Sequence, residues 1–182
     1  PWREGKVHIL KMMEGQIVTE DVREEVGYTE EKGRKVFKPD GTYQKIAAVE
    51  RHKNTGKIGV GIVKGFGLRG GAIASSVSHD SHNLIVIGDN DHDMYLAVQE
   101  LLRTQGGYTL VENGQVFDTL PLPIMGLMSD AGYEKVNEKL ARMISKAHEM
   151  GIPEGFDPFI TLSFMALPAV SYTHLRAHET TL

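Results

Sequence analysis

The stretch "LIVIGDNDHDMYLAVQELLRTQGGYTLVENGQVFDTL", residues 84–120, decides the fold class. It opens on LIVIG, a continuous apolar run of strand length, which is typical of a strand covered on both faces. Apolar side chains then recur at helical spacing until Gly106 and Gly107 end the pattern: Met94, Ala97, Val98, Leu101 and Leu102. Two alternating runs joined by Asn113 and Gly114 follow, which predicts a β-hairpin with a type I′ turn. The stretch therefore predicts a helix packed on a sheet that contains antiparallel strands.

The segments before this stretch predict further strands. Residues 6–13 and 16–26 each have strand-like patterns. Residues 27–42 are polar and rich in Gly, Lys and Glu, which predicts a surface loop. Residues 43–52 predict a strand that ends in charged side chains, and the apolar, glycine-interrupted residues 58–71 predict a buried strand that leads into a loop.

The segments after it predict one more helix and a buried end. Residues 133–151 have the pattern of an amphipathic helix. Its expected apolar face is formed by Val136, Leu140, Met143, Ile144 and Ala147. Residues 156–170 predict a buried segment. Strands that alternate with two amphipathic helices, together with a clear antiparallel hairpin, indicate a layered domain with a mixed sheet, of the α+β or α/β class.

The composition excludes several classes of protein. The chain has 182 residues, 41% of them hydrophobic, and a net charge of -4, which fits a globular domain and gives no electrostatic reason to expect nucleic acid or an anionic membrane as partner. No apolar run approaches the roughly 20 residues that span a bilayer. The absence of cysteine excludes disulfides, thiolate metal ligands and cysteine nucleophiles, and it is compatible with the cytoplasm.

Both ends of the chain are unusual. The sequence opens on Pro1-Trp2 without a methionine, so we interpret it as a piece of a longer protein. Residues 171–182, SYTHLRAHETTL, resemble the translated read-through of a sequencing adapter, and we interpret them as a non-native tail. His174 and His178 have the spacing of a metal-binding pair on a helix, but they lie in this tail and are discounted.

Two motifs have a structural interpretation that outweighs the functional one. GVGIVKG, residues 59–65, misses the spacing of a dinucleotide-binding loop by one residue, and no helix pattern follows it, so tight packing around glycine is the better account. DNDHD, residues 89–93, resembles part of a calcium loop, but Met94 stands where the sharp turn needs glycine. A capped helix start with acids at its positive end is the better account of that motif.

Polar residues gather in three clusters, each at the end of an expected strand: 50–52, 64–67 and 79–83. The last cluster, His79-Asp80-Ser81-His82-Asn83, contains the residue types of a nucleophilic triad. Neighbours on an extended chain point to opposite sides, so these residues cannot form a triad among themselves, and His79 and His82 face one side only if the backbone turns. The alternative is a structural turn in which Asp80 and Asn83 bond backbone groups.

Three blocks of the sequence resemble a known family: residues 47–98, AAVERHKNTGKIGVGIVKGFGLRGGAIASSVSHDSHNLIVIGDNDHDMYLAV; residues 106–130, GGYTLVENGQVFDTLPLPIMGLMSD; and residues 156–168, FDPFITLSFMALP. The chain resembles the C-terminal part of bacterial adenine deaminases, members of the amidohydrolase superfamily. The resemblance assigns residues 43–170 to that C-terminal domain and leaves residues 1–42 to complete a small β-domain.

The resemblance implies an activity that this chain does not carry alone. Such enzymes hydrolyse adenine to hypoxanthine and ammonia with a manganese or iron centre in a (β/α)-barrel domain, whose ligands include a His-x-His motif. This sequence contains no His-x-His, so we expect the barrel upstream of Pro1, no metal bound by this chain, and no activity of the fragment alone. Adenine is the expected substrate, and a cytoplasmic homo-oligomer is the expected assembly.

The resemblance also gives the 79–83 cluster a role. We expect His79, Asp80 and His82 to close the adenine pocket or to hydrogen-bond a group beside the metal. The expected substrate-binding or loop-orienting residues are Ser81, Asn83, Arg51, His52 and Lys64. Two alternatives stay open: a non-catalytic module that caps the barrel or forms a subunit interface, and an independent purine-binding domain.

Overall fold

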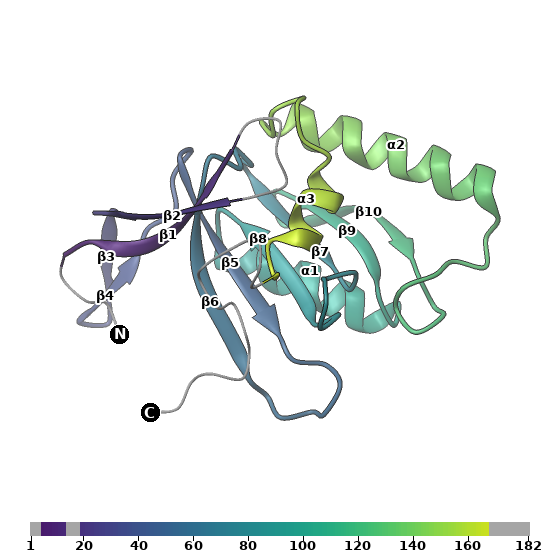
Figure 1. The fold of residues 1–182 in the computed structure, drawn as a ribbon, viewed down its shortest axis with the longest axis horizontal. Helices are drawn as coiled ribbons and strands as arrows, with labels where there is room; N and C mark the ends of the chain where they lie inside the picture. Colours follow the sequence, from purple (N-terminus) through teal and green to yellow (C-terminus); the bar gives the residue numbers. More distant parts are fainter. Residues whose placement is uncertain (1–4, 14–18, 168–182) are drawn as a thin grey trace.

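The computed structural model describes residues 5–13 and 19–167 and shows an eight-stranded mixed sheet with helices on both faces (Figure 1). The strand order is β10-β9-β7-β8-β5-β6-β1-β2, and every neighbouring pair is antiparallel except β1 with β6. The α+β prediction is confirmed. The elements are β1 (Val7–Met12), β2 (Thr19–Glu24), β3 (Tyr28–Glu31), β4 (Arg34–Phe37), β5 (Tyr43–Val49), β6 (Ile58–Lys64), β7 (Gly71–Ser75), β8 (Leu84–Gly88), α1 (Asp91–Arg103), β9 (Gly107–Glu112), β10 (Gln115–Pro121), α2 (Tyr133–Glu149) and α3 (Pro158–Phe164).

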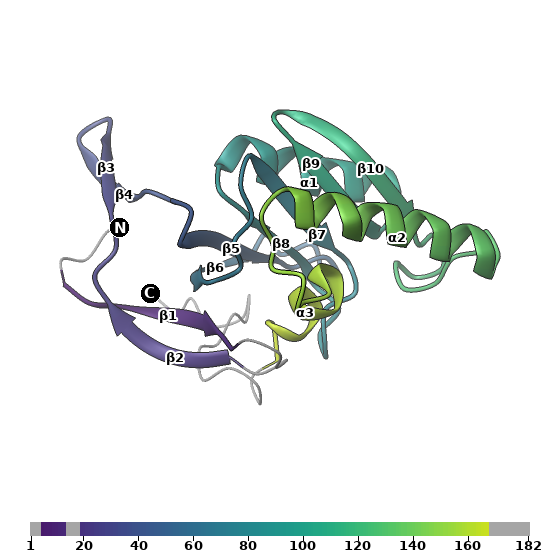
Figure 2. The same ribbon diagram turned by 90° about the horizontal axis from the view of Figure 1, so that it is seen from above.

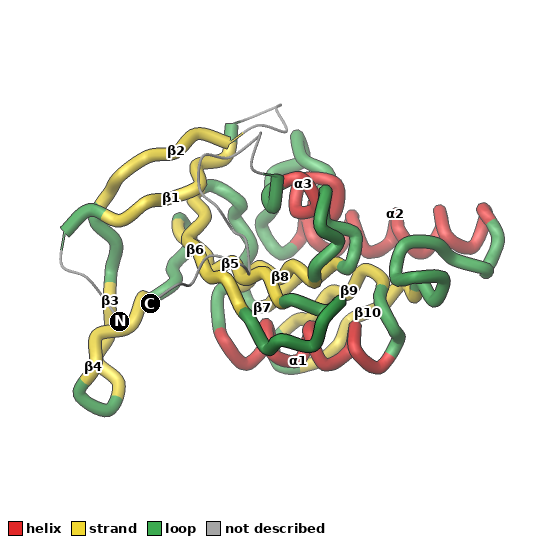
Figure 3. Tube along the Cα trace, turned by 60° about the horizontal axis from the view of Figure 1, so that its bottom comes forward, coloured by secondary structure: helices red, strands yellow, loops and turns green. Residues whose placement is uncertain are grey.

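The centre of the sheet is buried on both faces, as LIVIG predicts. All five residues of β7 and all five of β8 are buried. Ile85 and Ile87 belong to the core that includes Met143 of α2 and Phe159 of α3, whereas Val86 belongs to the core shared with α1. Figure 3 shows α1 on one side of the sheet and α2 and α3 on the other. Because strand side chains alternate between faces, one continuous apolar run serves both layers.

The helix and the hairpin of the 84–120 stretch form as predicted. The side chain of Asn90 caps α1 by accepting a hydrogen bond from the Asp93 backbone N–H at 2.8 Å, so the DNDHD motif is a capped helix start. Asn113 and Gly114 adopt φ angles of 48° and 80°, which fit the left-handed positions of a type I′ turn between β9 and β10.

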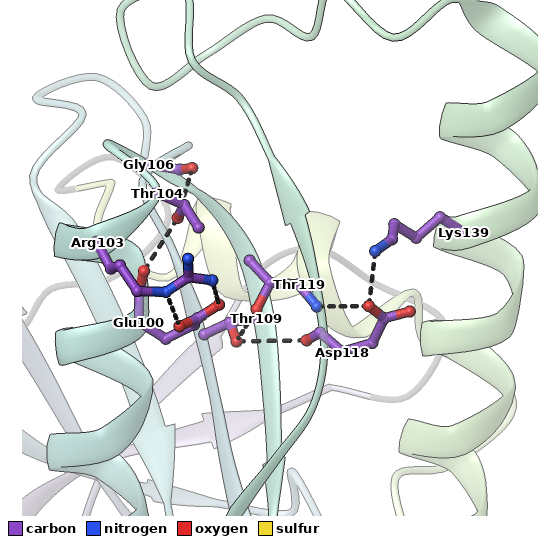
Figure 4. A network of polar contacts seen from close by, with 8 residues as sticks. All are labelled: Glu100, Arg103, Thr104, Gly106, Thr109, Asp118, Thr119 and Lys139. Atoms are coloured by element: carbon purple, nitrogen blue, oxygen red, sulfur yellow. Dashed lines mark hydrogen bonds and ion pairs between the residues drawn. The ribbon is translucent and has the colours of Figure 1, made fainter.

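Helix α2 packs on the sheet through the predicted face. Met143 and Ala147 are fully buried, and Val136, Leu140 and Ile144 pack against the same core. Asp118 of β10 anchors the helix, since its carboxylate accepts from Lys139 Nζ at 2.7 Å and pairs with Arg142 Nη2 at 2.9 Å (Figure 4 shows the contact with Lys139). These contacts hold α2 along the β10 edge of the sheet. Within the described ranges, none of the helices is long and apolar enough to cross a membrane.

Two predictions for the first 64 residues are wrong. Residues 27–42 contain the β3–β4 hairpin, which projects from the β1–β2 end of the molecule (Figure 2), rather than a loop alone. Strand β6 is not buried along its length, since Ile58 and Val60 are 53% and 70% exposed. The reason is that β1 pairs with β6 at Val63 and Lys64, so no strand among the described residues pairs with the first half of β6 on that side. Residues 14 and 15, between the first two predicted strands, and the tail at 171–182 lie outside the described residues.

Candidate functional site

The polar cluster 79–83 forms a tight turn between β7 and β8. The backbone N–H of His82 donates to Ser78 O at 2.5 Å, and His82 has a φ of 48°. The N–H of His79 donates to Ser163 O at 2.9 Å, which ties the turn to α3. The rings of His79 and His82 meet edge to face with centroids 5.6 Å apart. The backbone turns as the spacing required, and the two imidazoles therefore lie together.

The turn presents polar side chains at its tip and buries those at its base. Asp80 and Ser81 are exposed, His79 and His82 are half-buried, and Asn83 is buried. Within the described part of the chain, the side chains of Asp80 and Asn83 make no hydrogen bond to the backbone of the turn, so the structural alternative that assigned them this role is wrong in that detail. The turn is closed instead by three backbone N–H donors: that of His82 donates to Ser78 O, that of Ser78 to His82 Nδ1, and that of Asn83 to Ser81 Oγ.

The geometry favours a neutral His82. Its Nδ1 accepts the Ser78 backbone N–H at 3.4 Å, so in the neutral ring the proton lies on Nε2. Burial lowers the pKa of His82, and its electrostatic interactions with His79, Arg51 and His52 lower it further, while Asp80 opposes them. Near neutral pH, His82 is therefore a neutral imidazole whose Nε2–H is a hydrogen-bond donor.

Arg51 and His52, which follow β5, hold the turn by its backbone. Arg51 Nε donates to His82 O at 2.6 Å, and its Nη2 donates to Met125 O at 2.9 Å. His52 Nε2 lies 2.7 Å from Ser81 O, a pure acceptor, so this nitrogen carries a proton. Burial lowers the pKa of Arg51. A Cβ at Gly126, where φ is 75°, would lie 2.6 Å from Arg51 Nη1, so the guanidinium fits because that position is glycine.

Lys64 lies away from this cluster. Its Nζ is 2.7 Å from both carboxylate oxygens of Glu24, and the Tyr43 hydroxyl donates to the same carboxylate at 2.5 Å. This hydrogen bonding raises the pKa of Lys64 and lowers that of Glu24. Lys64 pairs with Tyr43 at the start of β5, whereas Arg51 follows the end of β5, roughly 20 Å away at about 3.3 Å per residue. The structure therefore joins Arg51 and His52 to the turn but not Lys64.

Glu50 belongs to the predicted 50–52 cluster, but the sequence pattern assigned it no role, and the structure shows that it is a supporting residue. Its buried carboxylate accepts the backbone N–H groups of His52, Lys53 and Thr55 at 2.5, 2.6 and 3.0 Å, and the Thr55 hydroxyl at 2.9 Å. These donors lower the pKa of Glu50 to about 2. The signal was an acid placed directly before a loop of polar residues and glycine. Glu50 thus organises the loop from which Arg51 and His52 extend.

Two buried oxygens lie at the base of the turn. Ser78 Oγ and Asn83 Oδ1 have no hydrogen-bond partner among the described residues, although both residues are at least nine-tenths buried. Ser78 was missed at the sequence level, because a serine that follows an apolar strand carries no distinctive pattern. Buried oxygens of this kind normally accept a hydrogen bond from a donor group or an ordered water.

The described residues do not offer a ligand set for a metal. Across residues 5–13 and 19–167, no three His, Asp or Glu side chains are grouped so that they could hold an ion. The turn instead offers one neutral imidazole donor, a second imidazole, an exposed carboxylate and an exposed hydroxyl. Such a set can hydrogen-bond a heterocycle or assist a proton transfer, but it is not a metal centre by itself.

Comparison with known proteins gives a consistent result. The family model described as "Adenine deaminase C-terminal domain" matches residues 16–178. Similar curated proteins are named adenine deaminase: one from Desulfitobacterium hafniense (strain Y51) is 52% identical over 162 residues, and one from Bacillus subtilis (strain 168) is 42% identical over 169 residues. The alignments cover 89% and 92% of this chain but only 28% of each relative.

A third relative, from Nitratidesulfovibrio vulgaris (strain DP4), is 55% identical over 135 residues, which are 74% of this chain and 24% of that protein. The chain thus spans less than a third of the length of these relatives. The family match begins inside residues 1–42 and ends inside residues 171–182. The predicted domain boundaries at residues 42 and 170 stay predictions.

Proposed function

The chain belongs to the adenine deaminase C-terminal domain family, and on this premise we propose that it is part of an enzyme that hydrolyses adenine to hypoxanthine and ammonia. In this reaction, an oxygen from water bonds to C6 of the purine and the bond from C6 to the exocyclic nitrogen breaks. The metal, manganese or iron, belongs to a catalytic region outside this chain. No step of the proposal passes through a metal on the described residues, because they do not form a ligand set.

We propose that the 79–82 turn covers the adenine pocket. The observation that carries this proposal is that Arg51 and His52 donate to the backbone carbonyls of the turn, while the Asp80 carboxylate and His82 Nε2 have no hydrogen-bond partner among the described residues. His82 Nε2–H is a donor for a ring nitrogen of the purine, and the exposed Asp80 carboxylate is an acceptor for its amino group. His79 and Ser81 complete the polar lining. In this proposal Arg51 and His52 position the turn, and Lys64 has no part in the pocket.

The test uses the full-length enzyme with His82→Ala or Asp80→Asn. Loss of one positioned hydrogen bond lowers kcat/KM for adenine by about 5- to 150-fold, since such a bond contributes on the order of 1–3 kcal/mol. His8→Ala, at an exposed imidazole on β1, is the matched control and leaves kcat/KM unchanged. Metal content, measured on every variant, separates a lost metal from a lost contact. Unchanged kinetics in both turn variants would overturn the proposal.

A second candidate function is a non-catalytic module that caps the barrel or joins subunits. It is favoured by the hydrogen bonds of Arg51 and His52, which stabilise the turn whether or not it contacts substrate. Under this alternative His82→Ala changes stability or assembly and leaves kcat/KM intact. An independent purine-binding domain would show saturable binding of adenine to this chain alone, and we expect none. The cytoplasmic location, the role in purine salvage and the homo-oligomeric assembly are further proposals from the family resemblance.

A further inference from the structure

A short apolar loop lies beside the candidate site. Residues 122–128, LPIMGLM, form the first part of the connection from β10 to α2 (Figure 1). They carry no charged side chain. Met125, Met128 and Ile124 are 76%, 55% and 43% exposed. Three large apolar side chains within five positions form an exposed patch of the kind that marks an interaction surface. Methionine is also common at binding surfaces, because its side chain adapts to the partner.

The 122–128 loop is held in one shape by its own hydrogen bonds. Ile124 and Met128 exchange backbone hydrogen bonds at 3.1 and 3.2 Å. Ser76 Oγ donates to Gly126 O at 2.6 Å, and Arg51 donates to Met125 O at 2.9 Å. These hydrogen bonds therefore fix a loop conformation that exposes the apolar side chains. Such pre-organisation lowers the entropy cost of docking a partner.

The position of the loop points to what covers it. The guanidinium of Arg51 contacts both Met125 O and His82 O, so the apolar loop and the polar turn share one support and face the same end of the sheet. The turn can serve a pocket only if another part of the enzyme lies against this end. The chain spans 28% of the length of its Desulfitobacterium and Bacillus relatives, so most of such a protein lies outside the structure.

We propose that Ile124, Met125 and Met128 form a docking surface for the N-terminal catalytic region of the same full-length polypeptide. This contact would keep the 79–82 turn over the adenine pocket. The inference rests on the proposed function for the position of the pocket, but its own test needs no substrate. A second copy of the chain and free solvent are the other possible occupants.

The test measures methionine oxidation by hydrogen peroxide in the full-length protein without adenine, followed by peptide mass spectrometry. The same protein unfolded in guanidinium gives the reference rate for each methionine. Met125 and Met128 oxidise at least about 10-fold slower in the folded protein than in the unfolded reference, because a docked surface excludes solvent and peroxide. Met143, fully buried in α2, is the internal standard for complete protection. Rates at Met125 and Met128 close to the unfolded reference would overturn the proposal.

Dilution of the full-length protein shows whether the docking surface is covered by the same polypeptide or by a second copy. Protection by the same polypeptide persists in dilute samples that light scattering shows to be monomeric, whereas protection that is lost in the monomer assigns the surface to a second copy and overturns the proposal.

A variant pair adds a second readout: Met125→Gln with Met128→Gln raises amide exchange in the 79–82 turn, and Leu102→Gln, at a side chain 58% exposed on α1, does not. If Met125 and Met128 are protected in a protein that does not deaminate adenine, the proposed function fails and the docking surface stands. If the protein deaminates adenine while Met125 and Met128 are unprotected, the docking surface is overturned and the proposed function stands.

Discussion

At the scale of single residues, the Glu50 carboxylate organises the loop around it. It accepts three backbone N–H groups and one hydroxyl, and with them it fixes the loop that carries Arg51 and His52. A carboxylate that collects so many donors is bound in its ionised form. The orientation of Arg51 and His52 therefore depends on the charge of Glu50, which contacts neither the turn nor any proposed ligand.

The charge of Glu50 predicts a dependence of stability on pH. The folded pKa is about 2, below the ordinary value of 4.5, so the ionised group stabilises the fold fully above pH 4.5. This contribution declines as the pH falls from 4.5 and is lost once the pH passes below about 2. Urea unfolding of the wild type and of Glu50→Gln checks it. The difference in unfolding free energy is largest at pH 6 and shrinks toward pH 3, whereas a constant difference would contradict the role of the charge.

The sequence indicated which residues gather at the site better than it indicated what they do. Arg51 and His52 could be placed near the turn because charged residues at neighbouring strand ends often meet. Their donors go to the carbonyls of His82 and Ser81, and no pattern of residue types reveals a bond to a backbone atom. Lys64 has the same appearance in sequence, but β5 separates it from the turn, and only the register of the strands shows this.

At the scale of elements, α1 depends on its cap. Asn90 accepts from the Asp93 N–H, and its amide donates to the carboxylates of Asp89 and Asp93. Asn90→Ala is expected to lower the free energy of unfolding by about 1 kcal/mol, measured by chemical denaturation. Asn90→Ser retains a capping oxygen and loses less. Equal losses in the two variants would show that the cap is not the cause.

Elements with a clear local sequence signal could be predicted. Elements whose burial depends on neighbouring strands could not. The buried β8, the two amphipathic helices and the Asn113-Gly114 hairpin each carry a local signal. The β3–β4 hairpin has no buried face, so its sequence resembles a loop. Strand β6 is apolar enough to predict burial, but its exposure is decided by how far β1 pairs along it.

At the scale of the whole molecule, the strand order depends on contacts between distant segments. Strand β5 lies between β6 and β8, and β7 lies between β8 and β9, so the chain order is not the spatial order. Such an arrangement follows from which faces can be buried together, and a single sequence does not encode it in any local period. The sequence was sufficient for the α+β class and the layers, but not for the topology.

The short junction between β1 and β6 has a mechanical consequence. Two residue pairs, Leu10 with Val63 and Lys11 with Lys64, join the β1–β2 hairpin to the sheet by strand pairing. Glu24 adds its contacts with Tyr43 and Lys64, and Leu10 and Met12 pack in the main core. Force applied to the N-terminal side acts on this β1–β6 junction before it reaches the buried strands. We therefore expect the junction to rupture first, while the central strands stay folded. In optical-tweezers pulling between residue 5 and α3, we expect an early, low-force extension on the order of 100 Å, the length of the 36 residues from Val7 to Thr42 at about 3.5 Å each. A single rupture of the entire domain would show that the β1–β6 junction resists force as strongly as the rest of the sheet.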